Sequence, residues 1–340
     1  MTDGVTILMP AYNQERYIAQ AVESALAQTY PHWELVIVDD ASTDRTPEIA
    51  QEYVARDRRV LYWRNERNSG AARSYNVALE CGDPAYPYFI ALPSDDRWTP
   101  TVLAELTAVA QAHPEADLVH CDMQLIDANN DFIQLYSALF DDMPSPGLHR
   151  SFALLCRGNY FGHPATLARK RALWQSPLAT EPFDPDLVHI HDYYLWVTLM
   201  NCGAQAYYLP KPLVQWRKHE GQLTSYANRV KSILEELLLF QDKLRQHIRP
   251  EREPDRRQAV LERLERLGPL FLQGGQPQEA RQYLAQARAL GSGRRLDLTV
   301  AEVIARLPVA PALQRGLWAS AVRINGALRG TPNDAARYSL

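Results

Sequence analysis

Two pairs of adjacent aspartates stand out among the residues of this chain that could do chemistry. Asp39-Asp40 directly follows the apolar run 35–38, and Asp95-Asp96 closely follows the apolar run 88–92. Adjacent carboxylates repel one another unless a cation or the hydrogen-bond donors of a ligand compensate their charge. Either pair alone is equally well explained as a turn or a helix cap, which are common roles of aspartate. Two such pairs on one edge of a sheet indicate a binding site.

The elements that must position these pairs alternate between two sequence periods. Short apolar runs typical of strands occupy residues 5–9, 35–38, 60–63 and 88–92. Helical periodicity or a helix-start signal follows each run, over residues 18–26, from Thr46, over 70–79 and from Thr99. Asn13 is predicted to cap the first of these helices. Four strand–helix alternations predict an α/β domain with a mostly parallel sheet, and the looser pattern over 117–160 predicts a mixed sheet there.

The carboxyl ends of parallel strands meet at one edge of a sheet, where ligands bind. The segments that follow the four strands contain Pro10, Ala11, Tyr12 and Glu15, then Asp39 and Asp40, then Arg73, then Asp95 and Asp96. The sequence has neither a Gly-x-Gly-x-x-Gly fingerprint after its first strand nor a Gly-Lys-Ser/Thr phosphate loop. A nucleotide bound here would have its phosphates held by a metal on carboxylates, and Mg²⁺ and Mn²⁺ prefer such oxygen ligands.

Composition excludes several classes of protein. Apolar residues make up 46% of the 340 residues and charged residues 22%, which is typical of a globular protein and not of a collagen-like, coiled-coil or disordered chain. The sequence has no apolar run of the length that spans a membrane and no signal-peptide pattern at its start. Its four cysteines are widely spaced, so we expect a reducing, cytoplasmic setting.

The net charge of −4 argues against nucleic-acid binding, but it is unevenly distributed. Residues 1–230 carry a net charge of −10 and residues 231–340 a net charge of +6. We therefore expect two domains, 1–230 and 231–340, the second helical, with a charged linker over 249–257 and a tetratricopeptide-like hairpin near 258–290. The basic second domain could contact an anionic membrane or an acidic partner, or could simply be a solvated helical surface.

The ordered motifs resemble family 2 glycosyltransferases of the GT-A fold, which have a Rossmann-like mixed sheet. The resemblance covers roughly residues 5–225 and rests on the segments 5–12, 25–30, 35–46 (LVIVDDASTDRT), 65–76 (NERNSGAARSYN) and 94–96 (SDD). Two later elements extend it: 191–196 (HDYYLW) is similar to the family's Glu-Asp-x-x-Leu-Trp element, and 216–219 (WRKH) is similar to its Tyr-Arg-x-His element.

The resemblance implies roles for the predicted rim residues in binding a nucleotide-sugar donor. Pro10, Ala11, Tyr12, Glu15 and Asp40, with Asp39 beside it, would hold the nucleoside, and Arg73 could contact a phosphate or the sugar. In the DXD-type motif, Asp96 would bind Mn²⁺ or Mg²⁺ and Asp95 would contact the ribose or sugar. The metal would neutralise the departing nucleoside diphosphate.

Asp192 is implied to be the general base that takes the proton of the acceptor hydroxyl. Attack opposite the diphosphate would invert the anomeric centre. His191 stands where an acid is more usual in the family, and Asp192 could alternatively cap a helix. His219 is either a further metal ligand, which would favour Mn²⁺, or a surface histidine.

The sequence therefore predicts a metal-dependent inverting glycosyltransferase. Its expected donor is a UDP-sugar, with GDP- and dTDP-sugars as alternatives, and its acceptor is a saccharide, a lipid-linked molecule or a protein. We expect a cytoplasmic enzyme that could contact the inner membrane surface through its basic helices. The alternatives are a nucleotidyltransferase, against which the missing glycine-rich loop argues, and a non-catalytic scaffold that binds partners through the helices.

Overall fold

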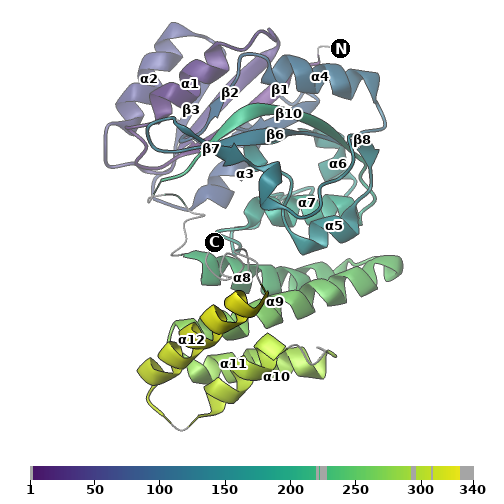
Figure 1. Ribbon diagram of the computed structural model, residues 1–340. Helices are drawn as coiled ribbons and strands as arrows, with labels where there is room; N and C mark the ends of the chain where they lie inside the picture. The colour runs from purple at the N-terminus through teal and green to yellow at the C-terminus, as the bar shows by residue number, and fades with distance from the viewer. Residues whose placement is uncertain (1–2, 220–221, 223–227, 292–295, 308, 330–340) are drawn as a thin grey trace. The chain divides into compact units, whose positions relative to one another are not determined.

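The computed structural model describes residues 3–219, 222, 228–291, 296–307 and 309–329. The chain forms two compact units, 1–222 and 223–340. The first unit contains the sheet and the second is helical (Figure 1). The division into functional domains at 230/231 stays a prediction.

One ten-stranded mixed sheet organises the first unit. Its strands are β1 (Val5–Ala11), β2 (Trp33–Asp39), β3 (Val60–Arg64), β4 (Tyr88–Ala91), β5 (Arg97–Trp98), β6 (Leu118–Ile126), β7 (Phe132–Leu135), β8 (Gly147–His149), β9 (Thr166–Arg169) and β10 (Ala206–Arg217). The main path runs β3-β2-β1-β4-β9-β6-β10-β5, with β7 beside β6 and β8 beside β10. Strands β3, β2, β1 and β4 are parallel, and the antiparallel β9 separates them from the parallel pair β6 and β10.

Helices cover both faces of this sheet (Figure 1). They are α1 (Ile18–Leu26), α2 (Thr46–Arg56), α3 (Ala71–Cys81), α4 (Val102–Ala112), α5 (Phe152–Arg157), α6 (Lys170–Trp174) and α7 (His191–Asn201). Residues of α1, α2 and α4 share one hydrophobic core with the sheet. The helix α3 packs on the other face, because the chain reverses its direction along the sheet between β3 and β4 and crossovers are right-handed.

The predicted α/β architecture with a mixed sheet is confirmed, including the first four strands and the helices after them. The predicted cap at Asn13 is wrong, because α1 begins only at Ile18 with Tyr17 as its N-cap residue. Asn13 adopts a left-handed conformation with φ 52°, which asparagine tolerates, and its Oδ1 accepts a hydrogen bond from the backbone N–H of Thr43 at 2.8 Å. It therefore joins the loop after β1 to the loop after β2.

The second unit consists of packed helices. They are α8 (Arg229–Leu238), continued by a π-helical turn (Leu239–Lys243), then α9 (Glu253–Gln273), α10 (Pro277–Ala289), α11 (Leu296–Arg306) and α12 (Pro311–Arg329). The helices α9 and α10 pack against each other and approach closely at Gly268, where a Cβ would lie 2.6 Å from the side chain of Leu284. The tetratricopeptide-like hairpin near 258–290 stays a prediction. Among the described residues, no helix combines the length and the apolar character needed to cross a bilayer.

The linker predicted over 249–257 is wrong. A 3₁₀ turn occupies Pro250–Arg252, and α9 begins at Glu253 with Pro254 in its first turn, where proline is compatible with a helix. Arg256 is buried and donates hydrogen bonds to Glu253 at 2.7 Å and to the carbonyl of Phe240 at 2.5 Å. The charged residues of this stretch therefore form the first turn of α9, and Arg256 joins α9 to the π-helical turn that contains Phe240.

Candidate active site

The ends of β1, β2 and β4 lie side by side because β1 pairs with both neighbours in parallel. Two hydrogen bonds hold the segments that follow these strands. Ser94 Oγ donates to the carbonyl of Pro10 at 3.0 Å, and the backbone N–H of Asp40 donates to the carbonyl of Ala11 at 2.8 Å. The three segments that the sequence predicted to form one rim are thus brought together.

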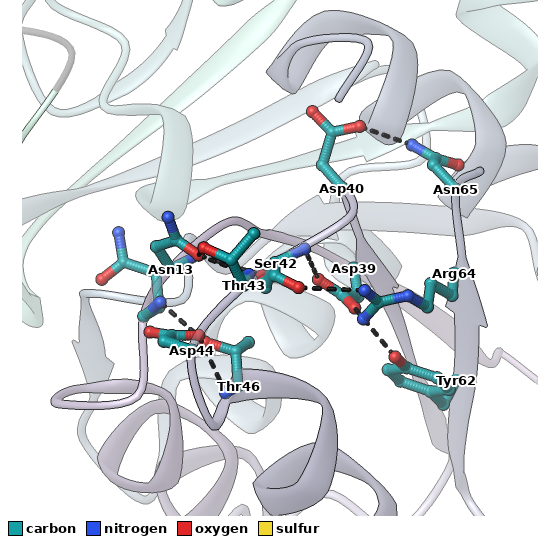
Figure 2. Close-up of polar contacts among 11 residues, drawn as sticks. Asn13, Asp39, Asp40, Ser42, Thr43, Asp44, Thr46, Tyr62, Arg64 and Asn65 are labelled. Atoms are coloured by element: carbon teal, nitrogen blue, oxygen red, sulfur yellow. Dashed lines mark hydrogen bonds and ion pairs between the residues drawn. The ribbon is translucent and has the colours of Figure 1, made fainter. Parts of the chain in front are cut away.

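Asp39 is fully buried and directed into the protein (Figure 2). Its Oδ1 accepts from the backbone N–H of Ser42 at 2.9 Å, and its Oδ2 accepts from the hydroxyl of Tyr62 at 2.9 Å and from the guanidinium of Arg64. The guanidinium also donates to the carbonyl of Ser42 at 2.9 Å. A buried carboxylate with this many donors fixes the turn after β2.

Asp40 is 3% exposed and holds the loop between β3 and α3. Its Oδ1 accepts from Asn65 Nδ2 at 2.7 Å and from the backbone N–H of Ser69 at 2.9 Å, and its Oδ2 accepts from the backbone N–H of Gly70 at 2.8 Å. The close-up shows Asp39 and Asp40 pointing to different partners, as alternation along a strand requires (Figure 2). Asp40 thereby positions the N-terminus of α3, where Arg73 lies exposed in the first turn.

The loop after β1 leaves Tyr12 accessible, with 45% of its surface exposed. The loop is attached to the turn after β2 by several bonds, including one from the backbone N–H of Glu15 to Asp44 at 3.0 Å. The carboxylate of Glu15 accepts from the backbone N–H of Arg45 at 3.1 Å. Glu15 is thus engaged in joining the two loops, while the aromatic ring of Tyr12 is free to contact a ligand at this edge.

In the second aspartate pair, burial and like-charge repulsion both destabilise the charged form of Asp96. Asp96 is 2% exposed, and the backbone N–H of Arg217 donates to its Oδ1 at 2.9 Å. Burial, followed by the charge of Asp95, raises the pKa of Asp96 well above its usual value. A cation placed here would relieve both the desolvation of Asp96 and its repulsion by Asp95.

Arg217, at the end of β10, organises this part of the site; the sequence placed it in the WRKH element at 216–219 but assigned it no role. Its side chain is 1% exposed, and it donates to the carbonyl of Asp95 at 2.8 Å, to Asn130 Oδ1 at 2.9 Å and to Gln20 Oε1 at 3.1 Å. Its guanidinium also lies 4.7 Å from the ring centroid of Tyr17. One buried guanidinium therefore joins β10, the DXD segment and α1.

His219 lies beside the aspartate pair, with its Nε2 3.0 Å from Asp95 Oδ2. Among the described residues, no three histidine, cysteine, aspartate or glutamate side chains are grouped as a metal site. Mg²⁺ and Mn²⁺ do not need such a cage, since they commonly bind one or two carboxylates and take the remaining ligands from substrate phosphates and water. The buried carboxylate of Asp96, repelled by that of the half-buried Asp95, fits a metal of this kind.

Asp192 occupies the first turn of α7, where Ile190 is the N-cap residue, so its carboxylate is not the helix cap. Asn159 Nδ2 donates to Asp192 Oδ2 at 2.9 Å. Burial raises the pKa of Asp192, while the neighbouring His191 and the bond from Asn159 act in the opposite direction. A carboxylate with a raised pKa beside a polar side chain is suited to act as a general base.

Tyr75 lies near both the Asp95-Asp96 pair and Asp192. This residue of α3 is 3% exposed, and its pKa is raised well above the usual value by burial and then by the charges of Asp95, Asp96 and Asp192. Its ring stacks on Phe183 at 5.0 Å between centroids and lies 5.3 Å from the ring of His191. The charges of Asp192 and of the Asp95-Asp96 pair, from distant parts of the sequence, therefore act on one tyrosine.

The family follows from a comparison with models of known protein families. Residues 6–176, half of the chain, match the model of glycosyl transferase family 2. This chain belongs to glycosyl transferase family 2. The sequence-based resemblance is confirmed, and the matched segment includes both aspartate pairs.

Relatives and solved structures agree with this assignment. The family 2 chain is 30% identical over 207 residues to WfgD of Escherichia coli, a UDP-Glc:α-D-GlcNAc-diphosphoundecaprenol β-1,3-glucosyltransferase. This alignment covers 58% of this chain and 74% of WfgD. Alignments with two other curated glycosyltransferases span only 36% and 66% of their lengths.

Two structures share the fold at 19% identity. TarS of S. aureus in complex with UDP matches with a TM-score of 0.63 over 96% of this chain and 92% of that one. The mannosyltransferase PcManGT from Pyrobaculum calidifontis, in complex with GDP-Man and Mn²⁺, matches with a TM-score of 0.61 over 98% and 83%.

Replacing Arg217 by lysine should destabilise the family 2 chain by about 2 kcal/mol, because several buried hydrogen bonds of about 1 kcal/mol each lose their donors. Urea denaturation measures the effect. The control is Arg157→Lys, whose ion pair with Asp142 is 3.2 Å long and exposed on both sides. Equal unfolding midpoints for the two variants would contradict the organising role of Arg217.

Proposed function

We propose that this chain is a metal-dependent, inverting glycosyltransferase that moves a sugar from a UDP-sugar to an acceptor hydroxyl in polysaccharide or glycoconjugate synthesis. The observation that carries the proposal is that the charges of Asp95, Asp96 and Asp192 all act on Tyr75, whose ring lies 5.3 Å from that of His191, the neighbour of Asp192. Such a site offers carboxylates for a metal-bound diphosphate and, separately, a carboxylate for proton transfer. Membership of the family and the donor complexes of its structural neighbours support this interpretation.

The donor would lie along the rim formed by β1, β2 and β4. Pro10, Ala11 and the exposed Tyr12 would contact the uracil and ribose. Asp40 would contribute both through its remaining lone pairs and by fixing the loop that carries Arg73 toward the phosphates. Asp39 would support the nucleoside from beneath, because Ser42 and Tyr62 donate to its carboxylate.

Asp96 would hold Mn²⁺ or Mg²⁺, with Asp95 contacting the ribose or sugar and His219 either orienting Asp95 or completing the metal site. The metal supplies positive charge that stabilises the departing diphosphate. Lys218 adds to the positive charge near Asp96, and burial lowers its pKa to about 8. The lysine is held over the ring of Trp216 at 3.5 Å.

In the reaction, Asp192 would accept the proton of the acceptor hydroxyl as its oxygen attacks the anomeric carbon. The bond between that carbon and the diphosphate oxygen breaks, and UDP leaves with the bonding electron pair. Attack from the side opposite the diphosphate gives inversion. The raised pKa of Asp192 makes it a stronger base than an exposed aspartate, provided that the pH keeps it deprotonated.

In the presence of Mn²⁺, the native chain should bind UDP at least tenfold more tightly than the variant Asp96→Ala does. The variant loses the carboxylate that would hold the metal. Calorimetry with UDP, GDP and dTDP, each with and without Mn²⁺, measures this. Protons compete with the metal for Asp96, so the affinity should rise as the pH increases through the raised pKa of this residue.

The matched control for this measurement is Asp131→Ala, because Asp131 is exposed beside β7 and should not change binding. Selective binding of GDP or dTDP would replace the UDP-sugar in the proposal. Binding of none of the three nucleotides by the native chain would contradict the glycosyltransferase proposal itself.

We also propose that the enzyme lies in the cytoplasm at the inner membrane surface, where its helical unit contacts anionic lipid. Its acceptor would be a saccharide, a lipid-linked molecule or a protein. Residues 231–340 carry the net charge of +6, and α12 contains no acidic residue. Leu313 and Leu317, one turn apart on this helix, are 54% and 39% exposed, and Arg315 between them is also exposed. Apolar and basic side chains on one helix favour an anionic interface.

Vesicles containing phosphatidylglycerol should sediment the native chain at low salt, and much less of it at high salt. The combined changes Leu313→Ser, Arg315→Glu and Leu317→Ser should remove this binding. The control is Val54→Ser with Leu61→Ser, which removes similarly exposed apolar side chains (38% and 39%) from the other unit. If the native chain stays in the supernatant at low salt, the membrane contact is wrong.

A further inference from the structure

Asn159 contacts the carboxylate of Asp192 from outside its helix. It lies between α5 and β9, 33 residues before Asp192, and its Nδ2 donates to Asp192 Oδ2 at 2.9 Å. Neither the composition nor the spacing of the sequence points to this residue. The contact is one of the polar interactions through which the fold acts directly on Asp192.

The backbone of Asn159 is itself anchored. The hydroxyl of Tyr136 donates to its carbonyl oxygen at 2.5 Å. Tyr136 is 9% exposed, and its ring packs edge-on against Phe140 and Trp216 with centroid distances of 5.1 and 5.6 Å. The packed ring of Tyr136 thus fixes the backbone at Asn159, which restricts the movement of the Asn159 side-chain amide away from the Asp192 carboxylate.

The orientation of the Asn159 amide follows from its partner. A carboxylate accepts hydrogen bonds only, so the NH₂ group must face Asp192, and the reversed amide would place two acceptors together. The Oδ1 atom of Asn159 is then buried, and it accepts no hydrogen bond from the described part of the chain. A buried acceptor of this kind needs a ligand hydroxyl or a water molecule beside the carboxylate.

We propose that Asn159 is a positioning residue of the reaction, which holds the Asp192 carboxylate in one orientation for proton transfer from the acceptor hydroxyl. The inference rests on the proposed role of Asp192 as general base. Asn159 transfers no proton, and its contribution acts through Asp192. Misplacing a reacting group by a fraction of its hydrogen-bond length lowers the rate, so fixing the carboxylate is a direct way to raise it.

The electrostatic consequence has a definite sign. Hydrogen bonding to the charged form lowers the pKa of Asp192, so removing the Asn159 donor should raise it further. The titratable groups that face this carboxylate are His191 beside it, Tyr75 of α3 and Tyr136 before α5. Of these, Tyr75 and Tyr136 stay neutral at working pH, since burial first and nearby carboxylates second raise the pKa of each.

The first test measures UDP release from a UDP-sugar, with water as acceptor, as a function of pH. Asn159→Ala should lower the rate at neutral pH about tenfold, and the acid limb of the profile should move to higher pH, because the base is protonated over a wider range. Tyr136→Phe, which removes the anchor of Asn159, should shift the limb in the same direction by less. The control Asn129→Ala, in an exposed turn, should leave the profile unchanged.

The second test does not depend on turnover. The pH dependence of unfolding is compared between the native chain and Asp192→Asn, and again between the two chains that also carry Asn159→Ala. Because the pKa of Asp192 is raised by folding, the native chain gains stability relative to Asp192→Asn as the pH falls through that pKa, and loses it as the pH rises. With Asn159→Ala this gain should begin at a higher pH.

The outcomes separate the two proposals. An acid limb and a stability difference that both move upward in Asn159→Ala, with UDP affinity unchanged, support the inference. An unmoved stability difference overturns it, whatever the rate does. If Asp192→Asn releases UDP as fast as the native chain, Asp192 is not the base, and the role assigned to Asn159 falls together with that part of the proposed function.

Discussion

Buried carboxylates at the end of a parallel sheet are the constraint on which the rest of this structure depends. Asp39, Asp40 and Asp96 all lie where strands end and are nearly inaccessible to water. A buried carboxylate is costly unless donors surround it. The loops after β2 and β3 therefore direct backbone N–H groups toward Asp39 and Asp40, which also accept from the side chains of Arg64 and Asn65. The backbone N–H of Arg217 donates to Asp96.

The compensation of these acids is unequal, and that difference supports the proposed site. Donors from the protein surround Asp39 and Asp40, so these residues shape the rim. Burial raises the pKa of Asp96 and that of Asp192, and the hydrogen bonds that each carboxylate accepts lower the pKa by less. Carboxylates that the fold leaves incompletely neutralised are those that a metal or a proton would neutralise, in keeping with the proposed roles of Asp96 and Asp192.

Much of the architecture could be predicted from the sequence because parallel strands covered by helices give apolar runs, and amphipathic helices give a second period. The convergence of the loops after β1, β2 and β4 followed from that pattern alone. The WRKH element includes Arg217, but its contacts could not be found in this way, since the bond from its backbone to Asp96 joins residues 121 positions apart. The pairing of Asn159 with Asp192 depends likewise on how α5 and α7 pack. The stretch 249–257 was misassigned because its prolines and charges are equally typical of a linker and of a helix start.

A crystal structure of the full chain with UDP and MnCl₂, with anomalous data that locate manganese, tests the central claim most directly. The account predicts one anomalous peak at Asp96, next to the diphosphate, with the uracil near Tyr12 and with Asp192 on the side of the sugar site away from the diphosphate. UDP bound elsewhere, or manganese bound without Asp96, would contradict it.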